Sequence, residues 1–228
     1  MIKAVFFDAI DTLFGPYPDK IGMYCRVIKK TAGFDVSPDK MKQVWDKIVI
    51  NTEEKAARMM SENGDLAWDG FNQKILELLD YQGDLKTAGK KLLYEAWSNP
   101  ENFVLYDDVI DTLVDLENKG IIIACVSNEN SQLNNFFVHF AIDKYFKFIM
   151  TSEEEGVEKP NPKIFKHALN RLNLEPKEAI HVGDSLISDY YGAEHLGLKA
   201  ILIDRDDKFR DNKKVEKIQN LTEVLKYI

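Results

Sequence analysis

Short, continuous apolar runs rich in β-branched residues alternate along this chain with segments of helical periodicity. Each run is three to six residues long and ends at a polar residue or a glycine. A strand buried on both faces needs apolar residues at every position, and such strands alternate with helices in α/β proteins that contain a parallel sheet. We therefore predict parallel strands at residues 4–7, 121–126, 148–150, 179–182 and 200–203.

Between these runs the apolar residues recur every three or four positions, as in amphipathic helices. This spacing predicts helices at residues 107–119, from Pro162 to about residue 172, and at 187–196. Proline fits the first turn of a helix, and glycine adopts the left-handed conformation that ends one. Pro162 therefore starts the second of these helices, and Gly120 ends the first.

Residues 15–99 interrupt the alternation. They contain no convincing strand, but their apolar spacing predicts helices at residues 21–31, from Pro38 onward, at 67–81 and at 85–97. In the second of these, Ser37 is the expected N-cap and Pro38 the first helical residue. We predict an α/β core of residues 1–14 and 100–228, interrupted by an all-helical module of residues 15–99.

The charge balance argues against a nucleic-acid partner. The 228 residues are 45% hydrophobic and carry 38 acidic against 30 basic side chains, which gives a formal net charge of −8. At this length folding buries roughly 70% of the surface that the unfolded chain exposes, so a sizeable core is expected. A negative surface repels the phosphates of nucleic acid, which bind clustered lysine and arginine.

The two cysteines and the hydropathy pattern favour a cytoplasmic protein without a membrane partner. Cys25 and Cys125 lie far apart and belong to no CxxC or His-rich motif, so we expect both to be reduced. The first apolar run reaches the acidic Asp8 too soon for a signal peptide. No apolar run approaches the roughly 18 residues that a membrane span requires.

Polar residues with useful chemistry follow several of the predicted strands. Open parallel sheets bind ligands at the carboxyl ends of their strands. Carboxylates bind hard cations, whereas hydroxyl and ammonium groups bind phosphate. The groups that could together hold a divalent cation and a phosphate belong to Asp8, Ser127, Asn128, Lys159, Asp184 and Asp189.

The ordered set of these motifs resembles that of the haloacid-dehalogenase superfamily, a group of hydrolases dominated by phosphatases. The motifs are DAIDTLF from Asp8, VSN around Ser127, EKPNPKIF around Lys159 and GDSLISD from Gly183. The helical insert lies where this family places its cap domain, so the resemblance covers essentially the whole chain. It implies a Rossmann-like core with a cap that closes over the strand ends, and a small phosphorylated metabolite as the substrate.

The resemblance also implies a nucleophile and a metal site. Asp8 would attack phosphorus and form an aspartyl phosphate that water then hydrolyses. Mg²⁺ would be held by Asp8, the backbone carbonyl of Ile10 and Asp184, with Asp189 as a direct or outer ligand.

A second implied set of residues would bind the phosphoryl group. Lys159 would act in catalysis and, with Thr12, Ser127 and the Asn128 amide, would hold the phosphoryl oxygens and offset their charge in the transition state.

One position departs from the pattern of the family's phosphatases. These carry a second aspartate two residues after the nucleophile, which protonates the leaving group and later activates water. This chain has Ile10 there, followed by Asp11 where the family usually has glycine. General acid–base catalysis is typically worth about 10²–10⁴ in rate. We therefore expect either weak turnover or a substitute acid, for which Asp11 is the obvious candidate.

Two alternatives to a phosphatase stay open. Loss of the second aspartate is also a feature of L-2-haloacid dehalogenases, which need no metal and carry neutral side chains in a motif that resembles SSNxxD. This chain keeps both carboxylates in GDSLISD and has no confident match to the cap arginine of that branch, for which Arg26 is the candidate. The other alternative is a non-catalytic module that kept the metal and phosphate pocket but lost turnover.

Overall fold

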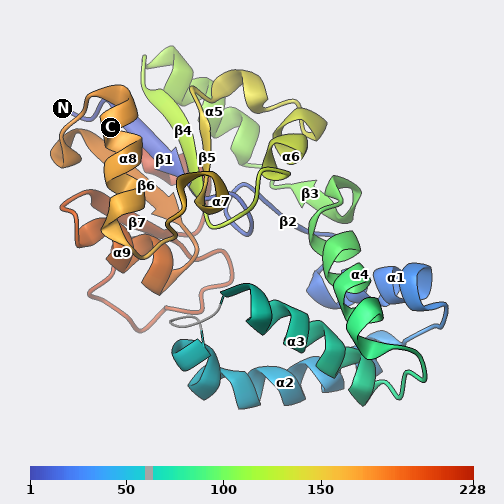
Figure 1. Ribbon diagram of the computed structural model, residues 1–228. Coiled ribbons are helices and arrows are strands. Elements are labelled where there is room, and N and C mark those ends of the chain that lie inside the picture. Colours follow the sequence, from blue (N-terminus) through green and yellow to red (C-terminus); the bar gives the residue numbers. More distant parts are fainter. Residues whose placement is uncertain (60–63) are drawn as a thin grey trace. The chain divides into compact units, whose positions relative to one another are not determined.

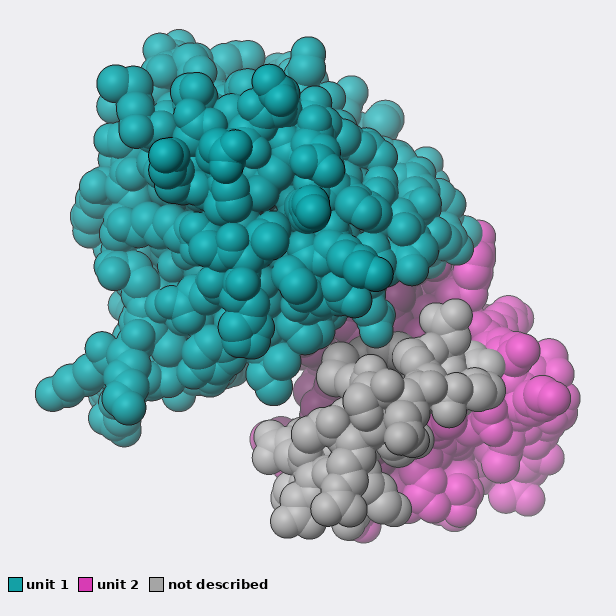
Figure 2. All heavy atoms as spheres, turned by 60° about the vertical axis from the view of Figure 1, so that its left-hand side comes forward, with its two compact units in different colours: residues 1–15, 105–228 teal, residues 16–104 magenta. Residues whose placement is uncertain are grey.

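The computed structural model describes residues 1–59 and 64–228, with side chains described outside residues 49–69. The chain forms two compact units, which Figure 2 shows in different colours. Unit 1 consists of Met1–Gly15 and Leu105–Ile228, and unit 2 of Pro16–Val104.

Unit 1 contains a six-stranded sheet in the order β5-β4-β1-β6-β7-β8. Every neighbouring pair is parallel. The strands are β1 (Ala4–Phe7), β4 (Ile122–Ser127), β5 (Ile149–Thr151), β6 (Ala179–Gly183), β7 (Lys199–Ile203) and β8 (Lys217–Ile218). The predicted parallel α/β sheet is therefore confirmed, with β8 as an additional short strand.

Helices cover both faces of this sheet (Figure 1). Phe6 and Val126 belong to one buried cluster with residues of α8 (Pro162–Leu172) and α9 (Gly192–Glu194). Val5 and Phe7 alternate with Phe6 along β1 and are buried as well, on the opposite face of the sheet, where α5 (Val109–Asn118) packs on β4. Burial on both faces explains why the strands are apolar at every position.

Several short elements connect the sheet strands. A π-helix, η4 (Leu186–Tyr191), and the short α9 occupy the segment for which a single α-helix was predicted. Ser185 is the N-cap of η4, because its hydroxyl oxygen accepts a hydrogen bond from the Ser188 amide. The others are α6 (Leu133–His139), η2 (Asp143–Tyr145), α7 (Ser152–Glu155) and η3 (Pro176–Glu178), and η5 (Leu221–Tyr227) follows the last strand.

Where the chain passes between the units, β2 (Phe14–Pro16) pairs with β3 (Phe103–Leu105). The prediction that residues 15–99 contain no strand was therefore wrong for residues 15 and 16, which belong to β2. Phe14 is followed by Gly15 and Pro16, so β2 contains no apolar run of the kind from which the other strands were predicted.

The described residues of unit 2 form helices α1 (Lys20–Ala32), α2 (Pro38–Met59), α3 (Gly64–Leu78) and α4 (Leu85–Trp97) and the 3₁₀ turn η1 (Pro100–Asn102) (Figure 1). Asp19 caps the start of α1, and Gly33 ends it in the left-handed conformation at φ 82°. Within the described residues, no helix is both long and apolar enough to cross a membrane.

The strand order places the carboxyl end of β1 at a switch point. From β1 the chain runs to β4 and β5 on one side and then returns to β6 on the other. Connections that leave toward opposite faces open a crevice at this point, where α/β sheets bind ligands. Asp8 is the first residue after β1.

Candidate active site

A buried ion pair joins Asp8 to Lys159. The Lys159 ammonium donates to Asp8 Oδ1 at 2.6 Å, and the Ser127 hydroxyl donates to the same oxygen at 3.0 Å. Only 2% of the Lys159 side chain and 11% of the Asp8 side chain are exposed. Three separate segments, the ends of β1 and β4 and the loop before α8, therefore meet at one carboxylate oxygen.

Asp189, on the π-helix η4, binds the other side of the same ammonium. Its Oδ1 lies 2.6 Å from Lys159 Nζ and 2.9 Å from His181 Nε2, and its Oδ2 accepts from the Ser185 amide at 3.0 Å. Gly183 makes this approach possible, because a Cβ there would lie 2.2 Å from Asp189 Cγ. The π-helix is a form of helix often found at functional sites.

Asp184 adds a third carboxylate. One oxygen from each of Asp8, Asp184 and Asp189 lies within 4.8 Å of the others. The Asp184 side chain has no hydrogen bond or ion pair with the described part of the chain. Burial raises the pKa of Asp184 well above its usual value, and the negative charges of Asp8 and Asp189 raise it further. The cluster therefore holds more negative charge than Lys159 offsets.

The pKa values of the ion pair reflect burial and charge together. Burial, reinforced by Asp189, raises the pKa of Asp8 despite the nearby ammonium. Burial disfavours the Lys159 ammonium, but Asp189 and Asp8 outweigh it and raise the Lys159 pKa. Burial also opposes ionisation of Asp189, yet Lys159 and His181 hold its pKa well below the usual range. Burial lowers the pKa of His181, which favours the neutral imidazole.

Asn128 contacts the backbone of the lysine loop. Its Nδ2 donates to the Lys159 carbonyl at 2.8 Å, and its Oδ1 accepts from the Lys159 amide at 2.7 Å. This reciprocal pair holds the loop that presents the ammonium. The predicted phosphate contact of the Asn128 amide stays a prediction.

Thr12 and Ile10 lie on the turn that follows β1. Thr12 is fully buried, and its hydroxyl oxygen has no hydrogen-bond partner within residues 1–59 and 64–228. A buried hydroxyl without a partner would gain one from a phosphoryl oxygen. Ile10 is half-buried, and the metal contact predicted for its carbonyl stays a prediction.

Three residues near these groups were missed from the sequence. His181 lies inside the apolar run of β6, which indicates only a hydrogen-bonded core residue, but its partner is the site residue Asp189. Glu129 follows Asn128, and burial together with the charge of Asp8 raises its pKa to about 7. Arg205 donates to the Thr12 carbonyl at 2.8 Å.

The charged stretch at residues 204–208 predicts a solvated loop, and this prediction is wrong for its first two residues. Asp204 is buried and accepts hydrogen bonds from the amides of Lys208 and Phe209. Arg205 is half-buried and paired with Asp108. Consecutive charged residues suggest solvent exposure, but here Asp204 and Arg205 form hydrogen bonds within unit 1.

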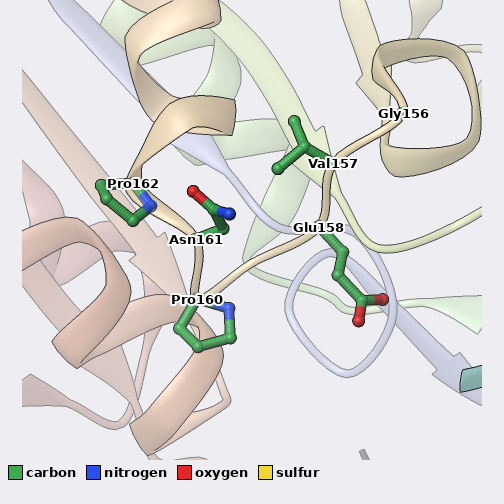
Figure 3. A pocket seen from close by; sticks show the side chains of 6 residues that line it. All are labelled: Gly156, Val157, Glu158, Pro160, Asn161 and Pro162. Carbon is green, nitrogen blue, oxygen red and sulfur yellow. The ribbon is translucent and has the colours of Figure 1, made fainter. Parts of the chain in front are cut away.

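A hollow of about 610 Å³ lies beside this site on the loop between α7 and α8. Figure 3 shows its lining, which comes from the single segment of residues 156–162. Lys159 is not part of the lining, because its ammonium is buried against Asp8 and Asp189. The hollow is therefore distinct from the carboxylate cluster.

Comparison with known proteins supports the same family as the motifs. The family model described as haloacid dehalogenase-like hydrolase matches residues 41–203, well over half of the chain. A haloacid dehalogenase-like hydrolase domain-containing protein 3 from Mus musculus is 36% identical over 111 residues, which cover 49% of this chain and 44% of that protein. The match thus spans less than half the length of the mouse relative.

Two further matches span nearly the whole chain. A glyceraldehyde 3-phosphate phosphatase from Methanothermobacter thermautotrophicus is 29% identical over 224 residues, 95% of this chain and 92% of that protein. The crystal structure of the HAD-hydrolase YfnB from Bacillus subtilis, bound to magnesium, has a TM-score of 0.84 at 19% identity and covers 99% of this chain and 98% of that one. This structural match shows a shared fold. From the family match and the ordered motifs, we conclude that the chain belongs to the haloacid dehalogenase-like hydrolases.

Proposed function

We propose that this chain is a phosphatase that hydrolyses a small phosphate monoester through Asp8. The observation that carries the proposal is the convergence of Asp8, Asp184 and Asp189 around the buried Lys159 ammonium. An ammonium and a hydroxyl beside a carboxylate nucleophile fit an anionic substrate, because they offset its charge. The relative from Methanothermobacter thermautotrophicus, which matches over 95% of this chain and is named a phosphatase, supports this reaction class.

The carboxylate cluster also supports a magnesium site. Three carboxylates with oxygens within 4.8 Å of one another repel each other, and Asp184 has no partner in the described residues. Mg²⁺ prefers oxygen ligands and is commonly held by one or two carboxylates. We propose that Asp8 and Asp184, with Asp189 and the Ile10 carbonyl, hold this ion. When bound, it would offset the charge of the nucleophile and of the phosphoryl group.

Asp8 provides a defined nucleophilic oxygen. Its Oδ1 accepts from Lys159 and Ser127, which leaves Oδ2 to attack phosphorus. As the Oδ2–phosphorus bond forms, the bond from phosphorus to the ester oxygen breaks, and the departing alcohol takes the electron pair and a proton. Water then attacks the phosphorus of the aspartyl phosphate, and inorganic phosphate leaves as the Asp8 carboxylate is restored.

Asp11 is the proposed source of the leaving-group proton. Ile10 has no ionisable group, whereas Asp11 lies on the same turn with φ 61°. The charge of Asp11 contributes to the raised pKa values of Asp184 and Tyr106, which places it within electrostatic reach of the site. Replacement by asparagine should lower kcat toward the rate seen without general acid catalysis, about 10²–10⁴-fold below wild type.

The test is phosphate release from a panel of small phosphate monoesters that includes glyceraldehyde 3-phosphate and an aryl phosphate. The wild-type chain should release phosphate with Mg²⁺, and a chelator should abolish the reaction. Asp8→Asn should behave like the chelated protein. Asp143→Asn, which changes an exposed aspartate of the same unit, is the matched control and should retain activity.

Other outcomes would favour the two alternatives. Chloride release from a 2-haloacid without metal would indicate a dehalogenase. Equal, slow phosphate release by wild type and Asp8→Asn across the panel would indicate a module that binds phosphate without turning it over.

A further inference from the structure

Arg205 joins segments of unit 1 that are far apart in the sequence. Its Nη1 donates to Asp108 Oδ2 at 2.8 Å, while its Nη2 donates to Asp108 Oδ1 at 3.0 Å and to the Thr12 carbonyl oxygen at 2.8 Å. A planar guanidinium that binds a carboxylate through two parallel hydrogen bonds has a fixed orientation, unlike the flexible ammonium of lysine. The donor to the Thr12 carbonyl is therefore held in a defined position.

The partners of Arg205 are themselves fixed. The Asp108 side chain is 7% exposed, and its Oδ2 also accepts from the Leu221 amide at 2.8 Å. The guanidinium carbon lies 3.9 Å from the centre of the Tyr106 ring, within range of a cation–π interaction. Asp204, which precedes Arg205, accepts hydrogen bonds from the backbone amides of Lys208 and Phe209 in the loop that follows. The guanidinium thus lies in a rigid frame.

The turn that receives this hydrogen bond carries the proposed nucleophile. It begins at Asp8 and closes through hydrogen bonds from the Leu13 amide to the Ala9 carbonyl and from the Asp11 amide to the Phe14 carbonyl, each 2.8 Å long. Asp11 adopts φ 61°, a left-handed conformation that aspartate tolerates better than most residues but that still costs more than it would for glycine. Contacts from outside the turn therefore add to its internal hydrogen bonds in holding this conformation.

Only two hydrogen bonds reach the carbonyls of Thr12 and Leu13 from elsewhere in the described residues. One comes from Arg205 to Thr12, and the other from the Tyr106 amide to Leu13 at 3.1 Å. Of these two hydrogen bonds, the one from Arg205 has a charged donor, and Asp108 fixes the orientation of that donor. Arg205 also stacks on the ring of Tyr106, so the two contacts support each other.

We propose that Arg205 is a positioning residue that holds the nucleophile turn, through the Thr12 carbonyl, in the conformation in which Asp8 and the Thr12 hydroxyl face the substrate. Its catalytic consequence rests on the proposed phosphatase function. Asp108 holds the guanidinium in place and therefore helps to position the turn indirectly, through Arg205. Arg205 touches neither substrate nor reacting atoms.

The kinetic test compares Arg205→Met, Arg205→Lys and Asp108→Asn with wild type on a phosphate ester that wild type hydrolyses. Misplaced catalytic groups cost rate, so kcat should fall at least about tenfold in Arg205→Met, while KM should change by less than about threefold. Arg205→Lys should lie between, because lysine keeps the charge but not the two-pronged contact. Arg210→Met is the control, because that arginine is 77% exposed and its ion pair in the described part of the chain is with Asp207.

A second measurement does not depend on turnover. In Arg205→Met, the amides of residues 11 and 13 should exchange hydrogen about tenfold faster or more, because the turn opens more often. Amides in the central strands β1 and β4 should be unchanged, which distinguishes loss of the turn from general unfolding.

The outcomes separate this proposal from the proposed function. Unchanged kcat in a folded Arg205→Met, or unchanged exchange at residues 11 and 13, would overturn the positioning role. If wild type hydrolyses no phosphate ester, the proposed function fails. Faster exchange confined to the turn would then still support the role of Arg205 in holding it, and unchanged exchange would refute it.

Discussion

Replacing Lys159 by methionine tests the charge balance of the site directly. The change removes the buried ammonium that lies 2.6 Å from both Asp8 Oδ1 and Asp189 Oδ1. Methionine has a similar length and apolar stem, so the loss of charge dominates over a change in volume. Three neighbouring carboxylates, including Asp184, are then left without a cation in metal-free buffer.

The magnitude follows from the burial of these groups. At an effective dielectric constant of about 20, charges 2.6 Å apart attract each other by about 6 kcal/mol. The cost of removing such groups from water offsets much of this attraction, and deleting one partner of a buried pair typically costs about 3–5 kcal/mol. We expect a loss of this size in the free energy of unfolding. At about 2–4 °C per kcal/mol, the melting temperature should fall by about 6–20 °C.

The assay is urea and thermal unfolding at pH 7.5 in the presence of a chelator. Lys163→Met is the control, because Lys163 is exposed near the same loop and should change stability by less than about 0.5 kcal/mol. Adding Asp189→Asn to Lys159→Met removes one of the unpaired charges and should recover part of the loss. A loss below about 1 kcal/mol in Lys159→Met would refute the reasoning, because it falls well under the cost expected for a buried pair.

The pH dependence of this variant has a defined sign. Lys159 helps to lower the pKa of Asp189 from its ordinary value of 3.8, so the stabilisation by this carboxylate is present above that pH and is lost as the pH falls below it. The difference between wild type and Lys159→Met should therefore shrink toward low pH. A difference that grows on acidification would contradict the ion pair as its source.

Three further predictions concern other residues. Burial and the charge of Asp8 raise the Glu129 pKa from 4.5 to about 7, so ionised Glu129 destabilises the fold as the pH rises through this range. In the presence of a chelator, Glu129→Gln should thus raise the free energy of unfolding by about 2–3 kcal/mol at pH 8 and by little at pH 4.5. An equal gain at the two pH values would contradict a raised pKa of Glu129. Gly183→Ala places a Cβ 2.2 Å from Asp189 Cγ and should cost about 1–3 kcal/mol in urea unfolding, so a neutral result would mean that the π-helix yields freely. In unit 2, Tyr24→Phe removes a hydroxyl that donates to a buried asparagine at 3.0 Å, and thermal unfolding should show a loss of about 1–3 kcal/mol unless water replaces it.

The parallel core was predictable because burial on both faces imposes a simple rule on the sequence. Strands β1, β4, β5, β6 and β7 are apolar at nearly every position, and the five predicted runs correspond to them. The short strands β2 and β8 were missed because glycine, proline or lysine interrupts their apolar character, and β3 was missed although it is as short and apolar as β5. The π-helix η4 was also missed, since its residues follow the same apolar spacing as an α-helix.

The proximity of several candidate site residues was predictable, but the hydrogen bonds and ion pairs among them were not. Parallel strands end at one edge of a sheet, so Asp8, Ser127 and Asp184 were expected to lie together. The sequence did not indicate that Lys159 joins Asp8 to Asp189, or that Asn128 binds the backbone of Lys159. These contacts depend on the path of the loop before α8.

From sequence alone, this chain is an α/β protein whose polar groups gather at strand ends, because local patterning and chain direction determine both properties. Only the tertiary structure assigns His181 to Asp189 and Arg205 to the Thr12 carbonyl. Arg205 and Thr12 are 193 residues apart, and neither carries a local pattern that marks the other as its partner. A hydrogen bond requires atoms to meet within about 3 Å, and across such a separation only the packing of the strands and loops around them brings the two groups together.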